Sequence, residues 1–456
     1  MNLARLLRAR ADAGRPVRVG LIGAGKFGSM FLAQLRTTPG LHLLGIADLS
    51  VPRARAALER TGWDADAAVA TSFDEALRTG RTMLTQDAGA LIAAGGLDVV
   101  VEATGNPAAG ANHALLAIAH GRHVVMVTVE ADVLVGPLLA ARARAAGVVY
   151  SMGSGDQPAL VCEMVDWARA CGFNVVCAGK GTKYLPSFHH STPDTIWSLY
   201  GLTPEQAAEG GMNAQMFNSF ADGTKSAIEM AAIANAANLR APSDGLLFPP
   251  CGVDDLATIL RPREAGGVLE HSGTVETVSS LERDGRPVFR DLRWGVYVVF
   301  EADPSPRGDY ARRCFKEYGV VTDSSGRYTA LYRPYHLIGL ELGISVASAA
   351  LRGEPTGATE FFNADVVAVA KRPLRAGEVL DGEGGYTVWG KLLPAASSLA
   401  RGALPIGLAH HAALRRDIAE GEVIGWSDVA VEDSAILRLR REMEQTFSNV
   451  ETGAMV

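Results

Sequence analysis

The glycine pattern at residues 23–28 constrains the fold of this chain more than any other feature. Gly23, Gly25 and Gly28 stand as G-x-G-x-x-G in "VRVGLIGAGKFG", directly between an apolar run and an amphipathic run. The first glycine permits a tight turn, the second lets the backbone approach a phosphate, and the third lets a helix pack closely on a strand. The pattern therefore predicts a strand, a turn and a helix that together bind a dinucleotide.

Short apolar runs and helical patterns alternate over the first third of the chain. The runs "LHLLGIAD", "LDVVVEATGNP" and "RHVVMVTVE" indicate buried strands, and segments such as "VPRARAALERTG" between them indicate helices. Continuous Val, Ile and Leu runs separated by helices are typical of a parallel sheet covered on both faces. We therefore predict an α/β protein in which residues 1–155 form a Rossmann-type, doubly wound parallel sheet.

The pattern becomes less regular after residue 155. "NVVCAGKG" and "GVYVVFEAD" indicate strands, and "SAIEMAAIANAANL" indicates a helix. These elements predict an α+β substrate domain over residues 156–360, which we also expect to mediate oligomer formation. After "LRGEPTGATEFF", short strands with glycine turns predict a small β-rich domain over residues 361–456.

Composition narrows the classes of partner and compartment. The net charge of -7 argues against nucleic acid or an anionic membrane as the main partner. The five cysteines show no CxxC spacing, which fits a reducing compartment. No apolar run is long enough to span a bilayer, and "MNLARLLRARADAG" indicates a short amphipathic helix instead of a signal peptide. We expect a soluble, cytoplasmic homo-oligomer that binds a small molecule.

An acidic residue follows the second predicted strand at the distance that dinucleotide-binding folds require. Asp48 ends this strand about 20 residues after the glycine turn and is placed to accept hydrogen bonds from ribose hydroxyls, which favours NAD. Arg53 can offset this charge, so NADP stays open. The full set expected to contact the cofactor is Gly23, Gly25, Lys26, Phe27, Gly28, Asp48, Arg53, Thr104, Gly105 and Asn106.

Two of the chain's few lysines, Lys180 and Lys183, fall in the glycine-flanked stretch "CAGKGTKYLPSFHHSTPD". Hydride transfer needs a group that polarises a carbonyl or takes a hydroxyl proton. Neighbouring ammonium groups can hold one anionic substrate, and their proximity lowers the pKa of one of them. We therefore predict that both lysines are catalytic or bind substrate. The alternative is a pair of solvated lysines in a mobile loop.

Two acidic residues complete the predicted catalytic set. Asp156 in "GSGDQPA" is expected to act as an orienting carboxylate or a metal ligand, or else to cap a helix that begins at Pro158. Glu130 follows the predicted strand "RHVVMVTVE" and is a candidate for substrate contact, whereas Asp132 fits a helix cap.

A second group of polar residues suits an anionic substrate. Arg333, Tyr335 and His336 in "YRPYHLIGLE" are predicted to bind it, the alternative being a packed aromatic ring beside a hydrogen-bonded histidine. His189 and His190 lack a third ligand at metal spacing, so we interpret them as a loop pair. Whether the reaction needs a divalent metal stays open.

Several longer motifs carry a family resemblance. "VRVGLIGAGKFG", "LDVVVEATG" and "VVMVTVEADVLVGP" resemble the cofactor domain of the homoserine-dehydrogenase type. "VEADVLVGP", "GSGDQPA", "CAGKG", "MAAIANA" and "YRPYHLIGLE" resemble the DXR-like (DRL) oxidoreductases, a second type of 1-deoxy-D-xylulose 5-phosphate reductoisomerase. "VAVAKRPLRAGEVLDGEGG" is similar to SAF domains, which are small and β-rich.

The chain also departs from these relatives. Where homoserine dehydrogenases carry a lysine after the fourth strand, it has "VTVEAD", and Asp48 stands where the reductoisomerases begin a basic cluster. The resemblance implies an NAD(P)-dependent oxidoreductase acting on a small polar hydroxy or keto compound, phosphorylated or not, as in the DXR-like reductoisomerases. The alternatives are an NAD-dependent dehydrogenase of a sugar-derived acid or polyol, and a non-catalytic protein that senses redox state or binds carbohydrate.

Overall fold

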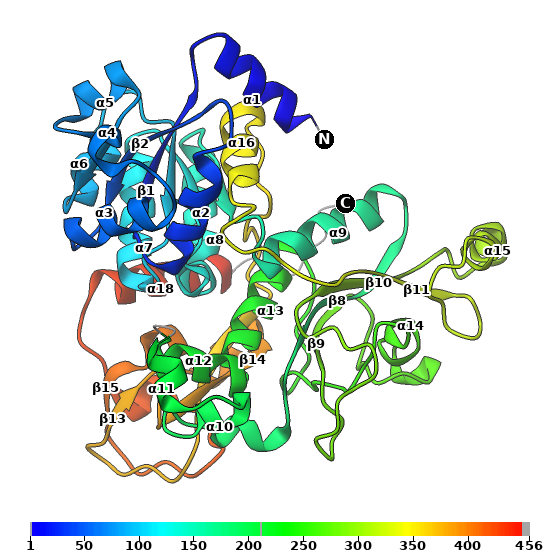
Figure 1. Cartoon of the computed structure of the whole chain (residues 1–456). Coiled ribbons are helices and arrows are strands. Elements are labelled where there is room, and N and C mark those ends of the chain that lie inside the picture. The colour runs from blue at the N-terminus through cyan, green and yellow to red at the C-terminus, as the bar shows by residue number, and fades with distance from the viewer. Residues whose placement is uncertain (1, 210–211, 449–456) are drawn as a thin grey trace. The chain divides into compact units, whose positions relative to one another are not determined.

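In the computed structural model, seven parallel strands form one sheet in the amino-terminal part of the chain (Figure 1). They follow the order β3-β4-β2-β1-β5-β6-β7. The order reverses at β1, which lies between β2 and β5, and such a point is where doubly wound sheets bind ligands. The predicted Rossmann-type sheet is confirmed. The strands are β1 (Val17–Ile22), β2 (Leu41–Ala47), β3 (Val69–Ala70), β4 (Thr82–Thr85), β5 (Val99–Glu102), β6 (His123–Met126) and β7 (Tyr150–Met152).

The structure describes residues 2–209 and 212–448, so Met1 and residues 449–456, at the ends of the predicted first and third domains, lie outside it. The chain divides into two compact units. The first contains Met1–Leu160 and His336–Glu360, and the second contains Val161–Tyr335 and Phe361–Val456. The division into three domains at residues 155 and 360 stays a prediction.

Helices flank the seven-stranded sheet, and one of them comes from far along the chain. Helix α16 belongs to the returning segment of the first unit, and α9 runs across the boundary between the two units. The helices are α1 (Leu3–Asp12), α2 (Lys26–Leu35), α3 (Val51–Arg60), α4 (Ala65–Ala68), α5 (Phe73–Thr79), α6 (Ala88–Ala93), α7 (Pro107–Ala119), α8 (Val129–Ala145), α9 (Gln157–Ala170) and α16 (Gly343–Arg352).

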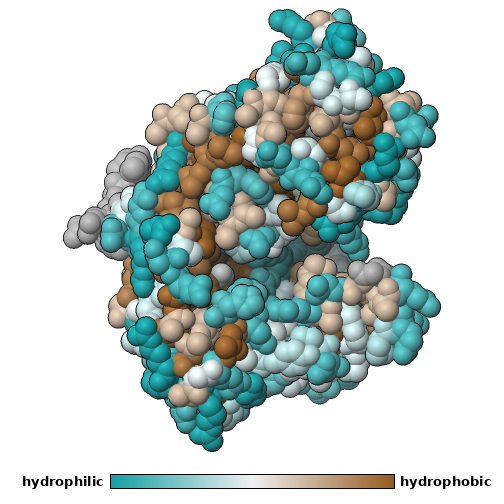
Figure 2. Space-filling model, turned by 90° about the vertical axis from the view of Figure 1, so that its left-hand side faces the viewer, coloured by the Kyte–Doolittle hydropathy of each residue, from teal (hydrophilic) through white to brown (hydrophobic). Residues whose placement is uncertain are grey.

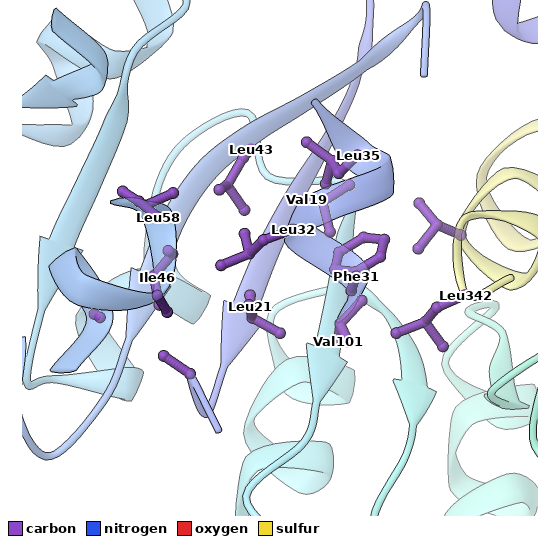
Figure 3. Packing of buried hydrophobic residues seen from close by; sticks show 14 of the residues in the cluster. Val19, Leu21, Phe31, Leu32, Leu35, Leu43, Ile46, Leu58, Val101 and Leu342 are labelled. Atoms are coloured by element: carbon purple, nitrogen blue, oxygen red, sulfur yellow. The ribbon is translucent and has the colours of Figure 1, made fainter. Parts of the chain in front are cut away.

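The core of the first unit explains why the glycine motif is followed by an apolar helix. Phe31 and Leu32 on α2 pack against Leu21 on β1, and all three side chains are almost fully buried (Figure 3). Leu342, which directly precedes α16, and Val346, which lies on α16, belong to the same cluster. Each buried Leu or Phe side chain contributes about 1.5–3 kcal/mol. The returning segment is therefore an integral part of this unit.

The second unit contains a four-stranded sheet in the order β11-β10-β8-β9. Strands β8 and β9 are parallel, whereas β10 is antiparallel to both β8 and β11. This mixed sheet agrees with the α+β pattern predicted for the middle of the chain. The strands are β8 (Asn174–Thr182), β9 (Thr274–Ser279), β10 (Val296–Glu301) and β11 (Tyr328–Arg333), and the helices are η1 (Pro186–His190), α10 (Ile196–Tyr200), α11 (Pro204–Glu209), α12 (Ala214–Ala221), α13 (Thr224–Ala237), α14 (Leu256–Ile259), η2 (Arg263–Ala265), η3 (Pro306–Gly308) and α15 (Asp309–Glu317).

The carboxyl-terminal part of the chain contains two small sheets, β12-β14 and β13-β15-β16. The predicted β-rich character is present, but the glycine turns gave no signal for α17 and α18. The elements are β12 (Ala364–Ala370), β13 (Val379–Asp381), β14 (Val388–Pro394), α17 (Ala395–Arg401), η4 (Ile406–Leu408), β15 (His410–Leu414), η5 (Trp426–Asp428), β16 (Val429–Ala430) and α18 (Ala435–Ser448).

Helix α13 is buried along most of its length and is hydrogen-bonded to this carboxyl-terminal part. The Asn235 side-chain oxygen accepts the backbone N–H groups of Asn363 and Ala364, each at 2.8 Å. At the start of the helix, Thr224 Oγ1 accepts the backbone N–H of Gly390 at 2.8 Å. The same helix lies against β8 and β9. It therefore connects the four-stranded sheet to β12 and β14.

A buried ion pair reinforces this connection. Lys371, at the end of β12, is 4% exposed, and its Nζ lies 2.8 Å from Asp222 Oδ2, just before α13. The same ammonium donates to the carbonyl oxygens of Ser191, at 2.8 Å, and Gly385, at 2.7 Å. This ammonium thus has two hydrogen-bond acceptors and one carboxylate as an ion-pair partner, which together offset the cost of burying its charge.

No helix among the described residues is long and apolar enough to cross a bilayer. On the face of the molecule shown in Figure 2, hydrophilic residues are spread between smaller groups of hydrophobic ones.

Helix α18 provides a test of how buried charge is held in this fold. Arg440 on α18 is fully buried and donates from two nitrogens to the two carboxylate oxygens of Asp365 on β12, at 3.1 and 2.6 Å. Arg440→Met leaves Asp365 buried without this partner, so we expect the free energy of unfolding to fall by about 3–5 kcal/mol. The measurement is urea unfolding of the unaltered chain and of the Arg440→Met variant.

Arg438 on the same helix is the matched control. It pairs with Asp433, and both side chains are largely exposed. Arg438→Met should cost no more than about 1 kcal/mol. If both substitutions lower the free energy of unfolding by the same amount, the buried pair contributes no more to stability than the exposed one.

Candidate active site

The glycine turn has the local geometry that pyrophosphate binding needs. Gly23 has a φ of 98°, and a Cβ there would lie 2.5 Å from the carbonyl oxygen of Ala103. A Cβ at Gly28 would lie 2.4 Å from the Gly23 carbonyl oxygen, so only glycine lets α2 pack this closely. At Gly25, which precedes α2, no atom lies within 4 Å of a Cβ position. This open space at a helix N-terminus fits a phosphate group.

Lys26 and Phe27 are the first two residues of α2, directly after the turn. Lys26 is exposed and Phe27 is half-buried, so neither side chain is committed to the core. Their contact with a cofactor stays a prediction.

Asp48 follows β2, as the sequence predicted, but it already has several partners. Its Oδ2 accepts the backbone N–H of Ala24 in the glycine turn at 2.8 Å, and its Oδ1 accepts that of Ser50 at 2.9 Å. Arg53 Nη2 lies 2.7 Å from Oδ1, and its side chain is 57% exposed. Burial alone would raise the pKa of Asp48, but Arg53 and the two N–H groups together lower it. A charged carboxylate and a cation therefore meet where the ribose is expected.

A buried carboxylate that the sequence analysis missed organises the next part of this edge. Glu102, the last residue of β5, is fully buried and accepts the hydroxyl protons of Thr104, at 2.6 Å, and Thr128. Thr128 Oγ1 in turn accepts the backbone N–H of Gly105 at 3.0 Å, and Asn106 caps α7. The signal was present, because an acidic residue ends an otherwise apolar strand. Glu102 holds the predicted cofactor loop in place.

The strand predicted over "RHVVMVTVE" is shorter than expected. Strand β6 ends at Met126, and helix α8 begins at Val129, so Glu130 lies in the first turn of a helix and not on a strand. Asp132 is buried, and its Oδ1 accepts the hydroxyl protons of Tyr150, at 2.9 Å, and Thr359, at 2.8 Å. Burial raises the pKa of Asp132 to about 6, although both hydrogen bonds oppose this. Asp132 is thus a packing residue, and the role of Glu130 stays a prediction.

Asp156 is in a position to cap α9. Its carboxylate accepts the backbone N–H of Gln157 at 2.8 Å, and its carbonyl oxygen accepts that of Leu160 at 3.2 Å. The helix begins at Gln157, one residue before the predicted start at Pro158. The side chain is buried, with the residue 8% exposed. Capping and a catalytic role for Asp156 therefore both stay predictions.

Lys180 lies inside a strand and not in a loop. It is 5% exposed on β8, with Val296 and Thr277 as its register partners on the two neighbouring strands. Its Nζ forms an ion pair with Glu229 on α13, which is also buried. The alternative of a solvated lysine is therefore wrong for Lys180.

The reason given for the glycines around Lys180 is also corrected. A Cβ at Gly179 would lie 1.8 Å from the carbonyl oxygen of Glu276, and one at Gly181 would lie 2.0 Å from that of Leu292. Both glycines are thus required because neighbouring segments of backbone come too close for a side chain. They do not by themselves indicate a ligand.

Lys183 follows β8 and has different partners from Lys180. Its Nζ donates to the carbonyl oxygen of Leu199 at 2.5 Å and lies 5.7 Å from the centroid of the Tyr200 ring. Burial lowers the pKa of Lys183, and the positive charge of Arg293 lowers it further. The structure therefore gives the two lysines separate surroundings.

Arg333 and Tyr335 lie together after β11. The Arg333 guanidinium carbon is 5.6 Å from the centroid of the Tyr335 ring, and Tyr335 is 52% exposed. His336 begins the returning segment that belongs to the first unit. The structure thus supports the pairing of a cation with an exposed phenol, and substrate binding by these three residues stays a prediction.

The two adjacent histidines are used within the fold. His189 Nε2 and Nδ1 lie 2.8 Å from the Tyr184 hydroxyl and 2.6 Å from the Asp222 carbonyl oxygen, and His190 Nδ1 lies 3.0 Å from the Lys371 carbonyl oxygen. Within residues 2–209 and 212–448, no group of three His, Cys, Asp or Glu side chains has the geometry of a metal site.

Two family models match the chain. Residues 155–342 match the catalytic domain of the oxidoreductase DRL, and residues 17–127 match the NAD-binding Rossmann fold of an oxidoreductase family. The chain is an oxidoreductase, and its residues 155–342 are similar to the DRL catalytic domain. Its first unit contains an NAD(P)-binding Rossmann domain, as the sequence predicted. The SAF-like assignment of residues 361–456 stays a prediction, because neither model reaches them. No curated protein sequence matches the chain.

Solved structures are similar to parts of this chain. An oxidoreductase from Agrobacterium radiobacter in complex with NAD+, L-tartaric acid and magnesium has 17% identity and a TM-score of 0.28 over 36% of this chain and 44% of its own. A probable dehydrogenase from Thermotoga maritima has 16% identity and a TM-score of 0.38 over 74% and 90%. DOX-P reductoisomerase in complex with magnesium has 14% identity and a TM-score of 0.31 over 47% and 56%. The chain thus spans about half the length of the first and third of these proteins.

The glycine turn yields a test that separates cofactor binding from folding. Gly25→Ala places a methyl group in open space at an ordinary backbone conformation, so stability should change by less than about 1 kcal/mol. The methyl group would occupy the space for a phosphate, so we expect the Kd for NAD(P)H to rise at least about tenfold. Titration of NAD(P)H fluorescence measures the Kd.

Gly28→Ala is the matched comparison, because its Cβ would clash with the Gly23 carbonyl oxygen. It should lower the melting temperature, whereas Gly25→Ala should not. If Gly25→Ala leaves the Kd unchanged, the turn does not hold the pyrophosphate.

Proposed function

We propose that this enzyme reduces or oxidises a small polar hydroxy or keto compound with a nicotinamide cofactor, and that Lys180 is its acid–base residue. The observation that carries this proposal is the buried pair of Lys180 and Glu229, which lies within the residues that match the DRL catalytic domain. A buried lysine is costly, and such residues cluster at functional sites.

The hydrogen-bonding capacity around Lys180 supports this role. An ammonium group has three N–H donors. Among the described residues, the Lys180 ammonium donates a hydrogen bond to Glu229. Thr277 is the register partner of Lys180, and Ser226 lies one helical turn before Glu229 on α13. The hydroxyls of both are buried and have no hydrogen-bond partner in the described part of the chain. Unsatisfied buried groups are expensive, so these hydroxyls favour a polar ligand.

The residues suit the following chemistry. The glycine turn would hold the pyrophosphate of the cofactor, and its nicotinamide would supply or accept the hydride. Lys180 would donate a hydrogen bond to the substrate carbonyl oxygen and give its proton to the alkoxide that forms during reduction. In the oxidative direction, Lys180 would take the hydroxyl proton. Glu229 would keep the ammonium group oriented, and its negative charge would offset the cost of burying that ammonium.

Within this class we favour the reaction of the DXR-like reductoisomerases, on the resemblance and on the match to the DRL catalytic domain. The test is nicotinamide oxidation with 1-deoxy-D-xylulose 5-phosphate, with NADPH or NADH and with or without a divalent cation. Turnover supports the reductoisomerase. Binding of the cofactor without turnover favours the second candidate, an NAD-dependent dehydrogenase of a sugar acid or polyol. The carboxylate of Asp48 supports this candidate, because it favours NAD over NADP.

Removal of the lysine tests the assigned role. Lys180→Met should lower kcat by about 100-fold to 10,000-fold, because the general acid is lost, while the Kd for NAD(P)H stays the same. The measurement is steady-state nicotinamide absorbance together with a cofactor titration.

The same substitution leaves Glu229 buried and unpaired, so it also tests stability. The double variant Lys180→Met/Glu229→Leu should regain most of the lost stability without regaining activity. Activity in the double variant close to that of the unaltered chain would remove Lys180 from the mechanism.

The pair of Asp48 and Arg53 is expected to set cofactor preference. We propose that NAD is favoured and that Arg53 permits some use of NADP by neutralising Asp48. Arg53→Ala should leave the carboxylate uncompensated and raise the ratio of kcat/KM for NAD over NADP about tenfold. A fall in this ratio, or no change, would contradict the assignment.

A further inference from the structure

Two cations of the second unit gather around one aromatic ring. The Lys183 ammonium lies 5.7 Å from the centroid of Tyr200, the last residue of α10, and the Arg293 guanidinium carbon lies 5.6 Å from the same centroid. The two residues are 110 positions apart in the sequence, since Lys183 follows β8 and Arg293 precedes β10. The fold therefore brings them together.

The two charges have no carboxylate partner. Neither Lys183 nor Arg293 forms an ion pair with any residue in the part of the chain that the structure describes. Two acidic residues of the same region have other partners. Asp291 accepts the backbone N–H of Arg293 at 2.8 Å, and Asp222 is paired with Lys371. The attraction to the Tyr200 ring compensates the two charges only in part.

Some other arginines of this unit are paired with carboxylates. Arg290 lies 3.0 Å from Asp254, and Arg286 lies 2.8 Å from Asp284. Arg293 instead lies close enough to another cation, Lys183, to lower the pKa of that lysine. Like charges held close together favour binding of an anion that neutralises both.

The cluster also reaches the surface. The Arg293 guanidinium carbon is 4.7 Å from the centroid of Trp294, a side chain that is 59% exposed. Both Lys183 and Arg293 are half-buried, so their charges are partly removed from water but open to a small molecule. Partial burial strengthens the attraction for an anion, because the local dielectric constant is lower than in water.

We propose that Lys183 and Arg293 form a subsite for the phosphate group of a phosphate monoester substrate. This assignment rests on the proposed function, since the substrate is the one on which Lys180 acts. Lys183 stands three residues after Lys180, which is about 10 Å along an extended chain. The planar fork of an arginine and the point charge of a lysine together match the three oxygens of a phosphate.

Phosphate binding can be tested without turnover. The full chain is saturated with NADH, so that the glycine turn is occupied, and inorganic phosphate is titrated by calorimetry. We expect saturable binding that weakens at least about tenfold, or about 1.4 kcal/mol, in Arg293→Gln and again in Lys183→Gln. Acetate in a parallel titration should bind much more weakly, since it offers fewer oxygens and less charge.

Arg313→Gln is the matched control. The Arg313 guanidinium carbon lies 5.8 Å over the Tyr310 ring, but no second cation shares that ring among the described residues. Its loss should leave phosphate binding unchanged. Arg293→Lys keeps the charge and should retain most of the affinity, and circular dichroism checks that each variant is folded.

The outcomes separate this inference from the proposed function. The subsite is overturned if the unaltered chain shows no saturable phosphate binding. It is also overturned if Arg313→Gln weakens binding as much as Arg293→Gln, or if acetate binds as tightly as phosphate. The double variant Lys180→Met/Glu229→Leu should bind phosphate normally. If that variant also keeps full turnover, the role of Lys180 fails while the subsite stands.

Discussion

The position of helix α13 is the constraint on which the second unit depends. Its Glu229 pairs with the buried Lys180, so the charge inside the four-stranded sheet is tolerated only while this helix stays in place. The helix is held from the other side because Asn235 and Thr224 accept backbone N–H groups of the segment that contains β12 and β14. The carboxyl-terminal part of the chain therefore contributes to the surroundings of Lys180 without touching it.

The two units solve the problem of buried charge in related ways. In the first unit, Glu102 is surrounded by threonine hydroxyls, and Asp48 by backbone N–H groups and Arg53. In the second unit, buried charges are compensated by ion pairs, such as that of Lys371 with Asp222. Each buried charge fixes segments that are distant in sequence, because an unpaired charge would cost several kcal/mol. The polar groups at the ends of β5 and β8 are thereby held in defined positions.

The sequence predicted the parallel sheet of the first unit, because local signals decide it, but not the returning segment that completes this unit. Apolar runs mark the strands, and the spacing of Gly23, Gly25 and Gly28 marks the turn. The surroundings of Lys180 could not be predicted, because Glu229 lies 49 residues away in a helix that looks apolar. The glycines beside Lys180 were misinterpreted for a related reason. A glycine required by a neighbouring strand and one required by a ligand look the same in a sequence. Pairs such as Lys183 and Arg293 are likewise determined only by the fold.

The hydrogen bonds between α13 and the carboxyl-terminal strands have a consequence for how such chains evolve. A domain that is joined to the rest of a chain only by a linker can be lost or exchanged without disrupting other contacts. Here, loss of residues 361–448 would expose the Asn235 amide and the Thr224 hydroxyl and leave Asp222 without its lysine. The carboxyl-terminal segment and α13 are therefore expected to change together during evolution, as two halves of one interface.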